Sequence, residues 1–551
     1  MIRKPNLILV TLLFLFVSFE NSFSQSPSQY ALIKRPVFQN PLIWKLTKSV
    51  TNSLWGKNLF GDPHSAVQSY MMNSQYELLS AVGFQLDNAW NRIVYSECLD
   101  DWMRAYGSFG SGTGQFNSPN RLDCEAPCDE QGALRYYYIY VSDALNNRIV
   151  KLRYDWWFGY QTMINDGAIT GNGLDLPQDL DINNGFDFSW IQNDYLWILN
   201  GNSQIKRYDL YEGAFKSTYG SYGHGVGQFC HPTAVVSGRS AFLQPPYDPY
   251  ANNDHFYVAD RGNNRIVWLI KAHGLSEYIT WCKELYLDRD IVDLETDIFG
   301  QLWAVDKTNG QLLKYTYDLR PLCIFGSEGT GENQFYRPMS FSNTGGYLGC
   351  GNSFVSEAWT DSSGGQYFAI GTDVLDLKIS SDQEHHLHNI QYTLIDPAKT
   401  TLRIYDESSV LIKSLMTNQT EYSGSCSHSW NGTNNSGAYV PTGRYRVVVI
   451  DSSVYRNSLE SGNPPTNYVT REAWFCHTHP SDSLLYGDAN GDKKISVSDV
   501  VYLINSLFKG GDAPQCDSPY QCADANCDNE ISVSDMVYLI NYLFKGGPAP
   551  C

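Results

Sequence analysis

The chain has 551 residues and a formal net charge of -19. This acidic balance argues against nucleic acid or an anionic membrane as a partner, because both bind clustered lysine and arginine. The length exceeds what a single hydrophobic core supports, so several domains are expected.

The N-terminus has the pattern of an export signal. Positive charge precedes an apolar run over residues 7–19, and Ser22 and Ser24 are small enough to precede a cleavage site. The apolar run is short for a membrane span. We therefore expect a signal peptide over residues 1–24, an N-terminal segment over 25–39, and a secreted, extracellular protein without a transmembrane segment.

The 13 cysteines are an odd number and do not form CxxC pairs with zinc spacing. In an exported chain disulfides are the default interpretation. Cys124 and Cys128 are close enough in sequence for a local bridge. Four more gather near the C-terminus: Cys516, Cys522, Cys527 and Cys551. The pairing of these cysteines stays open.

A Gly-rich motif recurs through the first two thirds of the chain. It reads YGSFGSGTGQFNSP at 106–119, YGSYGHGVGQFCHP at 219–232 and FGSEGTGENQFYRP at 325–338. The first two copies are followed by alternating apolar stretches with an Asn-Asn turn, at 136–152 and 255–269. This alternation predicts β-hairpins.

Weaker copies of the hairpin occur at 82–97, 194–210 and 300–319. A repeat of roughly 50 residues built only of strands is typical of a β-propeller, in which each blade covers its neighbour's apolar face. The amino-acid sequence of the motif and hairpin resembles that of the NHL repeat. We expect a propeller of about six blades over residues 40–380, within a mainly β chain.

The repeated hairpins carry an acid and an arginine at matching positions. Asp143 and Asp260 are expected to be turn carboxylates that accept backbone N–H groups rather than catalytic residues. Arg148 and Arg265 are expected to form ion pairs between blades rather than to bind substrate.

From residue 366 the pattern becomes that of sandwich strands. The string WNGTNNSG at 430–437, followed by VPTGRY, resembles the FlgD-like immunoglobulin domain, in which a buried Trp precedes a Gly-rich loop. We expect this Ig-like β-sandwich over 381–478, with a start near 366 as the alternative, and a linker over 479–486.

The C-terminus contains two copies of a loop-helix unit. DANGDKKISVSDVVYLINSLFKGG at 488–511 returns at 524–547 with 19 of 24 positions identical. Oxygen donors stand at positions 1, 3, 5, 9 and 12 of each twelve-residue loop, and position 7 offers a backbone carbonyl, which is Ca²⁺ spacing. The candidate ligands are Asp488, Asn490, Asp492, Lys494, Ser496 and Asp499, then Asp524, Asn526, Asp528, Glu530, Ser532 and Asp535.

This duplicated unit resembles the type I dockerin, a small EF-hand-like helical module over 487–551. The resemblance implies two bound Ca²⁺ ions and attachment to a cohesin-type receptor. It further implies that positions 10 and 11 of each loop choose the receptor: Val497, Ser498, Val533 and Ser534. Because the two pairs are identical, either copy could dock. The alternative is that these residues only cap and pack the helices.

Apolar residues recur at helical spacing after each loop. We expect these residues to bury one helix against the other. They are Val501, Ile504, Leu507 and Phe508 in the first copy, and Val537, Ile540, Leu543 and Phe544 in the second.

No short catalytic motif is present: no nucleophile elbow, phosphate-binding loop or zinc-protease helix. His385, His386 and His388 could hold a metal, but neighbouring strand residues face opposite ways, so a polar loop is the simpler interpretation. The same holds for Cys476, His477 and His479. No catalytic residue is nominated.

Three functions remain. The leading hypothesis is a secreted binding or scaffold protein, whose propeller presents a surface to a glycan or protein. Its dockerin would attach it to a receptor at the cell surface or to an extracellular assembly. The second is a carbohydrate-active hydrolase or lyase delivered by the dockerin, supported only by family association. The third is a structural subunit of an extracellular fibre or coat, with the dockerin contacting neighbouring copies.

Overall fold

The computed structural model of the chain describes residues 43–51, 63–72, 78–97, 104–125, 136–155, 162–182, 195–210, 212–238, 254–271, 278–297, 299–329, 334–344, 351–358, 363–370, 373–382, 387–453, 468–479, 486–492, 494–514, 522–526, 528 and 530–550. The predicted signal peptide over 1–24, the segment 25–39 and most of the linker 479–486 lie outside these residues.

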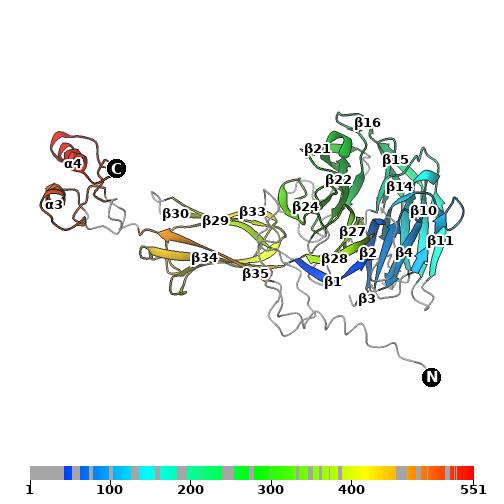
Figure 1. Cartoon of the computed structure of the whole chain (residues 1–551), viewed down its shortest axis with the longest axis horizontal. Helices are drawn as coiled ribbons and strands as arrows, with labels where there is room; N and C mark the ends of the chain where they lie inside the picture. The colour runs from blue at the N-terminus through cyan, green and yellow to red at the C-terminus, as the bar shows by residue number, and fades with distance from the viewer. Residues whose placement is uncertain are drawn as a thin grey trace, which may run out of the picture.

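Six four-stranded antiparallel sheets form the blades of a closed ring (Figure 1). The innermost strands β2, β8, β12, β18, β22 and β26 contact one another in that cyclic order, and β26 returns to β2. The prediction of a mainly β chain with a propeller of about six blades is confirmed.

The blades consist of β2 (Pro63–Met72), β3 (Leu78–Asp87), β4 (Arg92–Glu97) and β5 (Arg104–Tyr106); β8 (Pro119–Glu125), β9 (Tyr136–Asp143), β10 (Arg148–Asp155) and β11 (Thr162–Ile169); β12 (Asp179–Ile182), β13 (Tyr195–Asn200), β14 (Gln204–Asp209) and β15 (Phe215–Tyr219); β18 (Ala234–Gly238), β19 (Asp254–Asp260), β20 (Arg265–Lys271) and β21 (Ile279–Tyr286); β22 (Ile291–Thr296), β23 (Leu302–Asp306), β24 (Gln311–Tyr315) and β25 (Pro321–Phe325); and β26 (Pro338–Thr344), β27 (Gly351–Ala358), β28 (Ser363–Ile370) and β1 (Ile43–Thr51).

The sixth blade is completed by the start of the described chain. β1 pairs antiparallel with β28, so the outermost strand of the last blade precedes the first blade in sequence. Backbone hydrogen bonds between the two ends of the domain therefore close the ring and leave no blade with three strands.

The Gly-rich motifs connect the outer strand of one blade to the inner strand of the next. The first two contain short parallel pairs, β6 (Ser108–Phe109) with β7 (Gln115–Phe116) and β16 (Ser221–Tyr222) with β17 (Gln228–Phe229). Phe116 and Phe229 are fully buried under these loops. Gly107 and Gly220 have positive φ, and a Cβ at either position would collide with the buried Phe ring.

The hairpin carboxylates hold these loops in place. Asp143 Oδ1 accepts the backbone N–H of Asn117 at 2.6 Å, and Asp260 Oδ1 accepts that of Cys230 at 2.7 Å. The structure thus gives these acids the turn role that was expected, next to the 3-10 turns η2 (Ala144–Asn146) and η3 (Arg261–Asn263).

The arginines differ from expectation in their ion-pair partner. Arg148 and Arg265 each pair at 2.7 Å with the Asp of their own hairpin, not with an acid of another blade. The five-residue spacing across the tight turn places acid and arginine directly opposite on adjacent strands. Each arginine also donates to carbonyls of the Gly-rich loop, such as Gln115 O and Gln228 O.

The sandwich has two sheets. One contains β29 (Val374–Asp382), β30 (Leu387–Leu394) and β33 (Gly424–Trp430); the other contains β32 (Leu411–Glu421), β31 (Ala398–Asp406), β34 (Gly443–Ser453) and β35 (Tyr468–His477). Trp430 is buried between the sheets and donates its indole N–H to Thr433 O at 2.8 Å.

The alternating stretch from residue 366 is divided between two domains. β28 (Ser363–Ile370) pairs with propeller strands, whereas β29 (Val374–Asp382) opens the sandwich, earlier than residue 381. Alternation alone could not separate them, since propeller and sandwich strands share the same period of two.

Two helices, α3 (Val497–Phe508) and α4 (Val533–Lys545), pack together at the C-terminal end. The expected apolar face is correct only in part. Ile504, Ile540 and Leu543 pack against the shared core, but the centre of that core lies one helix position away. Val500 and Leu503 are buried, with Met536 and Leu539 opposite, while Val501 and its counterpart Val537 are half exposed. The sequence has paired apolar residues at these positions, so its periodicity fits either face.

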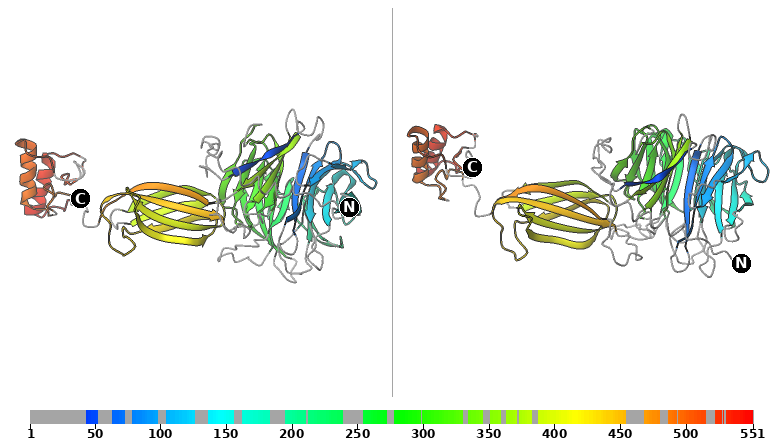
Figure 2. Two further views of the ribbon diagram at one scale, coloured as in Figure 1. Left: turned by 90° about the horizontal axis from the view of Figure 1, so that it is seen from below. Right: turned by 60° about the horizontal axis from the view of Figure 1, so that its bottom comes forward.

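Propeller, sandwich and helices follow one another along the long axis (Figures 1 and 2). Within the described residues no helix is both long and apolar enough to cross a membrane.

Candidate functional site

The duplicated loops bring carboxylates together at two places. In the first loop Asp488, Asp492 and Asp499 offer oxygens that all lie within 4.8 Å of one another. In the second, Asp524, Asp528 and Asp535 do the same. Convergent hard oxygens at this spacing suit a divalent cation such as Ca²⁺.

Hydrogen bonds to backbone N–H groups shape the first loop. Asp488 Oδ1 and Asn490 Oδ1 both accept the N–H of Asp492, at 3.1 and 2.9 Å, and Asp492 Oδ1 accepts that of Lys494 at 3.0 Å. These bonds fold the chain so that alternate side chains point inward, which lowers the ordering cost of binding.

The start of α3 fixes the last acid of the loop. Ser496 caps the helix and Asp499 accepts the Ser496 N–H at 2.8 Å, which together form a capping box. Asp499 also accepts the N–H of Asn490 at 3.2 Å, which ties the two ends of the loop together. Positions 9 and 12 are therefore held by the helix terminus itself.

The second loop repeats this network. Asp524 and Asn526 accept the N–H of Asp528 at 3.1 and 3.0 Å, and Asp535 accepts that of Ser532 at 2.9 Å. Asp528 Oδ1 accepts the N–H of Glu530 at 2.9 Å.

The electrostatics of both loops fit a cation. Burial raises the pKa of Asp499 and Asp535, and repulsion from the other two carboxylates of each loop adds to this, against the effect of backbone hydrogen bonds. A divalent cation would relieve the repulsion, so the donor set fits Ca²⁺.

The four predicted partner-binding residues lie on the surface at the starts of α3 and α4. Val497 and Val533 are each 50% exposed and pack against neither helix core. Ser498 and Ser534 are exposed as well, but each Oγ accepts from the loop Asn at 3.0 or 3.1 Å. The valines are thus free to contact a partner, while the serines also support the loops.

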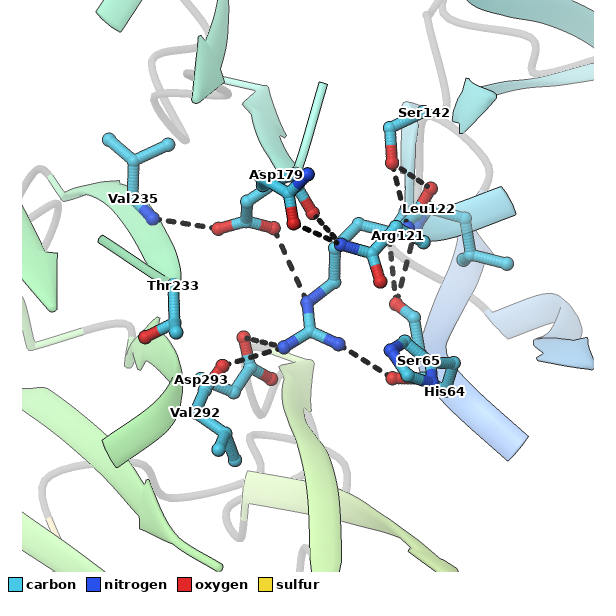
Figure 3. Close-up of polar contacts among 12 residues, drawn as sticks. His64, Ser65, Arg121, Leu122, Ser142, Asp179, Thr233, Val235, Val292 and Asp293 are labelled. Atoms are coloured by element: carbon cyan, nitrogen blue, oxygen red, sulfur yellow. Dashed lines mark hydrogen bonds and ion pairs between the residues drawn. The ribbon is translucent and has the colours of Figure 1, made fainter. Parts of the chain in front are cut away.

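A second polar cluster, which the sequence did not suggest as a site, lies at the propeller axis (Figure 3). Arg121 on β8 donates to His64 O at 2.6 Å and to Val292 O on β22 at 2.7 Å. Its guanidinium also lies 3.5 Å from Asp179 and 3.6 Å from Asp293. Because β8 and β22 belong to opposite blades, this side chain crosses the centre of the ring.

Three more acids sit two residues further along the same strands: Asp123, Asp181 and Glu295. Residues i and i+2 of a strand share a face, so these acids also face the axis. Burial raises the pKa of Asp123 to about 6 and that of Asp181 well above its usual value. Burial likewise raises the pKa of Glu295, and the charges of Asp123 and Asp181 add to it. We call these three acids, together with Arg121, Asp179 and Asp293, the axial cluster.

Most carboxylates of the axial cluster join one blade to the next. Asp123 accepts the N–H of Ile182 at 2.8 Å, Asp179 that of Val235 at 2.7 Å, and Asp293 that of Phe341 at 2.9 Å. Asp181 accepts the N–H of Ser237 at 3.0 Å. Glu295 has instead a bond of 3.2 Å from its neighbour Thr296. The tripeptides Arg-Leu-Asp at 121, Asp-Leu-Asp at 179 and Asp-Leu-Glu at 293 were the sequence signal for this cluster.

Two of the histidines considered for a metal meet inside the sandwich. His388 Nε2 lies 2.9 Å from His477 Nδ1, and Ser381 Oγ lies 2.7 Å from His388 Nδ1. Both rings pack on Trp430. Among the described residues the two loop clusters alone bring three possible metal-binding groups together. We therefore interpret His388 and His477 as part of the packed sandwich core.

Comparison with family models identifies two of the three parts. Residues 378–453 match the FlgD Ig-like domain, and residues 486–544 match the dockerin type I domain. The chain therefore contains a FlgD Ig-like sandwich and a C-terminal dockerin type I module. Dockerin type I modules bind calcium, attach to cohesin-type partners and occur in extracellular proteins.

No curated protein matches the chain. Among solved structures, virginiamycin B lyase from Staphylococcus aureus is 12% identical with a TM-score of 0.35, over 60% of this chain and 99% of that one. U3-55K is 11% identical with a TM-score of 0.33, over 63% and 91%. Likenesses at this level carry no argument about function.

Proposed function

We propose that the protein is a secreted, non-catalytic binding or scaffold protein, which the dockerin fastens to a cohesin-type receptor in a calcium-dependent manner. The propeller presents a surface to a glycan or protein ligand, and the sandwich separates it from the attachment module. The observation that carries the proposal is the pair of preshaped acidic loops, each continuous with a helix whose first residue is an exposed valine.

Each loop takes one Ca²⁺, so the module takes two. Asp, Asn and Ser side chains at positions 1, 3, 5, 9 and 12 would hold the ion, with the carbonyls of Lys494 and Glu530 at position 7. The ion supplies a charge that neutralises three converging carboxylates. The chain's own contribution is to orient them through the capping boxes and loop hydrogen bonds.

The attachment is tested with the full secreted chain and a panel of immobilised type I cohesins. We expect binding to at least one cohesin in Ca²⁺, loss of binding in a chelator, and recovery when Ca²⁺ returns. Asp488→Ala with Asp524→Ala removes a ligand from each loop and should abolish binding. Absence of binding to every cohesin, or binding that survives the double variant, would contradict the proposal.

The identical exposed valines support docking in two orientations related by a half-turn. Val497→Asp and Val533→Asp should each leave cohesin binding intact, whereas the double variant should lose it. Val410→Asp, an exposed valine of the sandwich, is the matched control. If either single change abolishes binding, only one orientation is used.

Catalysis at the propeller axis is the second candidate, favoured by Asp181 and Glu295, two partly buried acids whose pKa is raised mainly by desolvation. Raised pKa values of this kind occur in general acids, although ion networks also produce them. A polysaccharide hydrolase or lyase would release sugar products, and Glu295→Gln should abolish that release. No product from a broad polysaccharide panel, with folded protein, would remove this candidate.

A further inference from the structure

An amine and two carboxyl groups meet where the propeller packs on the sandwich. Lys314 lies on β24, and its Nζ is 2.5 Å from Asp396 Oδ1. Asp396 belongs to the turn between β30 and β31 of the sandwich. Asp297, in the turn after β22, places Oδ2 at 3.3 Å from the same Nζ. Residues far apart in sequence thus form one Lys-Asp-Asp cluster across the domain boundary.

This cluster is closed off from water. The exposed fractions of Lys314, Asp396 and Asp297 are 2%, 7% and 7%. Leu375 and Ile395 of the sandwich join the same apolar core as Trp303 and Phe341 of the propeller. Lys314 Nζ also lies 4.8 Å from the centre of the Trp303 ring. The amine therefore cannot exchange its partners for solvent.

The two carboxyl groups are held differently. Asp297 is fixed by three donors: the N–H groups of Phe299 and Gln301 bond to Oδ1 at 3.0 and 2.9 Å, and the Trp303 indole bonds to Oδ2 at 3.2 Å. Among the described residues, the carboxyl of Asp396 has a hydrogen bond to Lys314 only. Asp297 is thus placed as a fixed proton acceptor, and Asp396 as the group next to the amine.

We propose that Lys314 and Asp396 form an intramolecular isopeptide bond that covalently joins the propeller to the sandwich. The ammonium of Lys314 passes one proton to the Asp396 carboxylate, which leaves a neutral amine beside a neutral acid. Nζ then attacks Cγ of Asp396. Asp297 takes the second proton from nitrogen and returns it to the departing hydroxyl, so that one C–N bond forms, one C–O bond breaks and one water leaves.

Three physical conditions favour this step. Contact between amine and carboxyl replaces a bimolecular encounter, which is equivalent to a very high effective concentration. Exclusion of water disfavours the separated charges and the reverse hydrolysis. Burial raises the pKa of Asp396 to about 6, which makes its protonated form accessible near neutral pH. The pKa of Lys314 is also raised, because the charges of Asp396 and Asp297 outweigh its burial, so the proton transfer to Asp396 is the uphill part of the step. The nearby Cys323 does not compete as a nucleophile, because burial raises the pKa of its thiol well above its usual value.

The direct test is the intact mass of the full, reduced protein. We expect it to fall short of the mass of its sequence by one water. Tryptic peptides should show the residue-314 segment joined to the residue-396 segment, without cleavage after Lys314. A native mass equal to the full sequence, with free peptides around both residues, would overturn the proposal and leave a buried ion pair.

Two variants separate chemistry from folding. Lys314→Arg keeps the positive charge and hydrogen bonding but removes the reacting amine, and Asp297→Asn keeps the size of the proton acceptor but removes its basicity. Both should have the full mass. A protease site inserted between residues 370 and 373 gives a second readout. After cleavage and denaturation the wild-type halves should stay together and those of both variants should separate. Separation of the wild-type halves, or a cross-link that persists in Asp297→Asn, would contradict the mechanism.

Discussion

At the scale of single residues, the axial cluster makes stability depend on pH. Acids whose pKa is raised by folding bind protons more readily in the folded state, so stability falls as pH rises through the interval between the unfolded and folded pKa values. The pKa rises to about 6 for Asp123 and about 7 for Asp179, mainly because both are buried. The relevant interval therefore runs from about pH 4 to about pH 7.

We predict that the propeller melts at a higher temperature at pH 5 than at pH 8. Glu295→Gln replaces a partly buried acid of raised pKa with a neutral side chain of similar size, so it should raise the melting temperature at pH 8 and flatten the pH dependence. Scanning calorimetry at both values measures this, and an unchanged pH slope in Glu295→Gln would contradict it.

Arg121 is expected to be among the most sensitive residues of the propeller. Arg121→Ala would leave Asp179 and Asp293 buried without their cation, and the cost of breaking such a buried pair is about 3–5 kcal/mol. Arg320→Ala is the control, since Arg320 pairs with Asp318 at 2.9 Å on the surface and should cost less than about 1 kcal/mol. Denaturant unfolding compares the two; similar losses would show that Arg121 has no special role.

At the scale of elements, the two loop-helix units differ in charge although their backbones share one hydrogen-bond pattern. Lys494 of the first loop and Glu530 of the second are both exposed at position 7. Lys493 and Asn529, at position 6, lie outside the described residues. The exposed cation should make the first loop bind Ca²⁺ more weakly than the second.

A charge exchange tests this ranking. Lys494→Glu in a chain with Asp524→Ala should strengthen the remaining first site, and Glu530→Lys in a chain with Asp488→Ala should weaken the remaining second site. Each change should be about 1 kcal/mol or less, because the side chains face solvent, and should shrink with added salt. Calorimetric titration measures both. If the two changes in calcium affinity have the opposite signs, backbone geometry, such as the positive φ of Gly491, decides which loop binds more tightly.

At the scale of the whole molecule, the junction makes propeller and sandwich depend on each other. Ile395 is fully buried in a core whose other members are mostly propeller residues. Ile395→Ala should therefore cost about 2–5 kcal/mol, as for other large-to-small core changes. A propeller fragment ending at residue 370 would lose both Ile395 and Leu375.

The measurement is thermal unfolding, in which the protease sensitivity of each domain reports when that domain unfolds. We expect Ile395→Ala to lower the melting temperature of the propeller as well as that of the sandwich. Ile412→Ala is the control: Ile412 is partly buried, packs against the sandwich core and is not part of the junction core, so the change should lower the sandwich transition alone. A propeller transition unaffected by Ile395→Ala would show that the domains fold independently.

The sequence by itself determined the repeats, the class of each domain and the two acidic loops. These features depend on neighbours in the chain: the period of two in strands, the Asp-to-Arg spacing across a hairpin and the ligand spacing of Asp488 to Asp499. Only the tertiary structure decided which helix face is buried, where β28 ends the propeller, how Arg121 spans opposite blades and how Lys314 meets Asp396. The physical reason is that these contacts depend on the three-dimensional path of distant segments, which local periodicity does not specify.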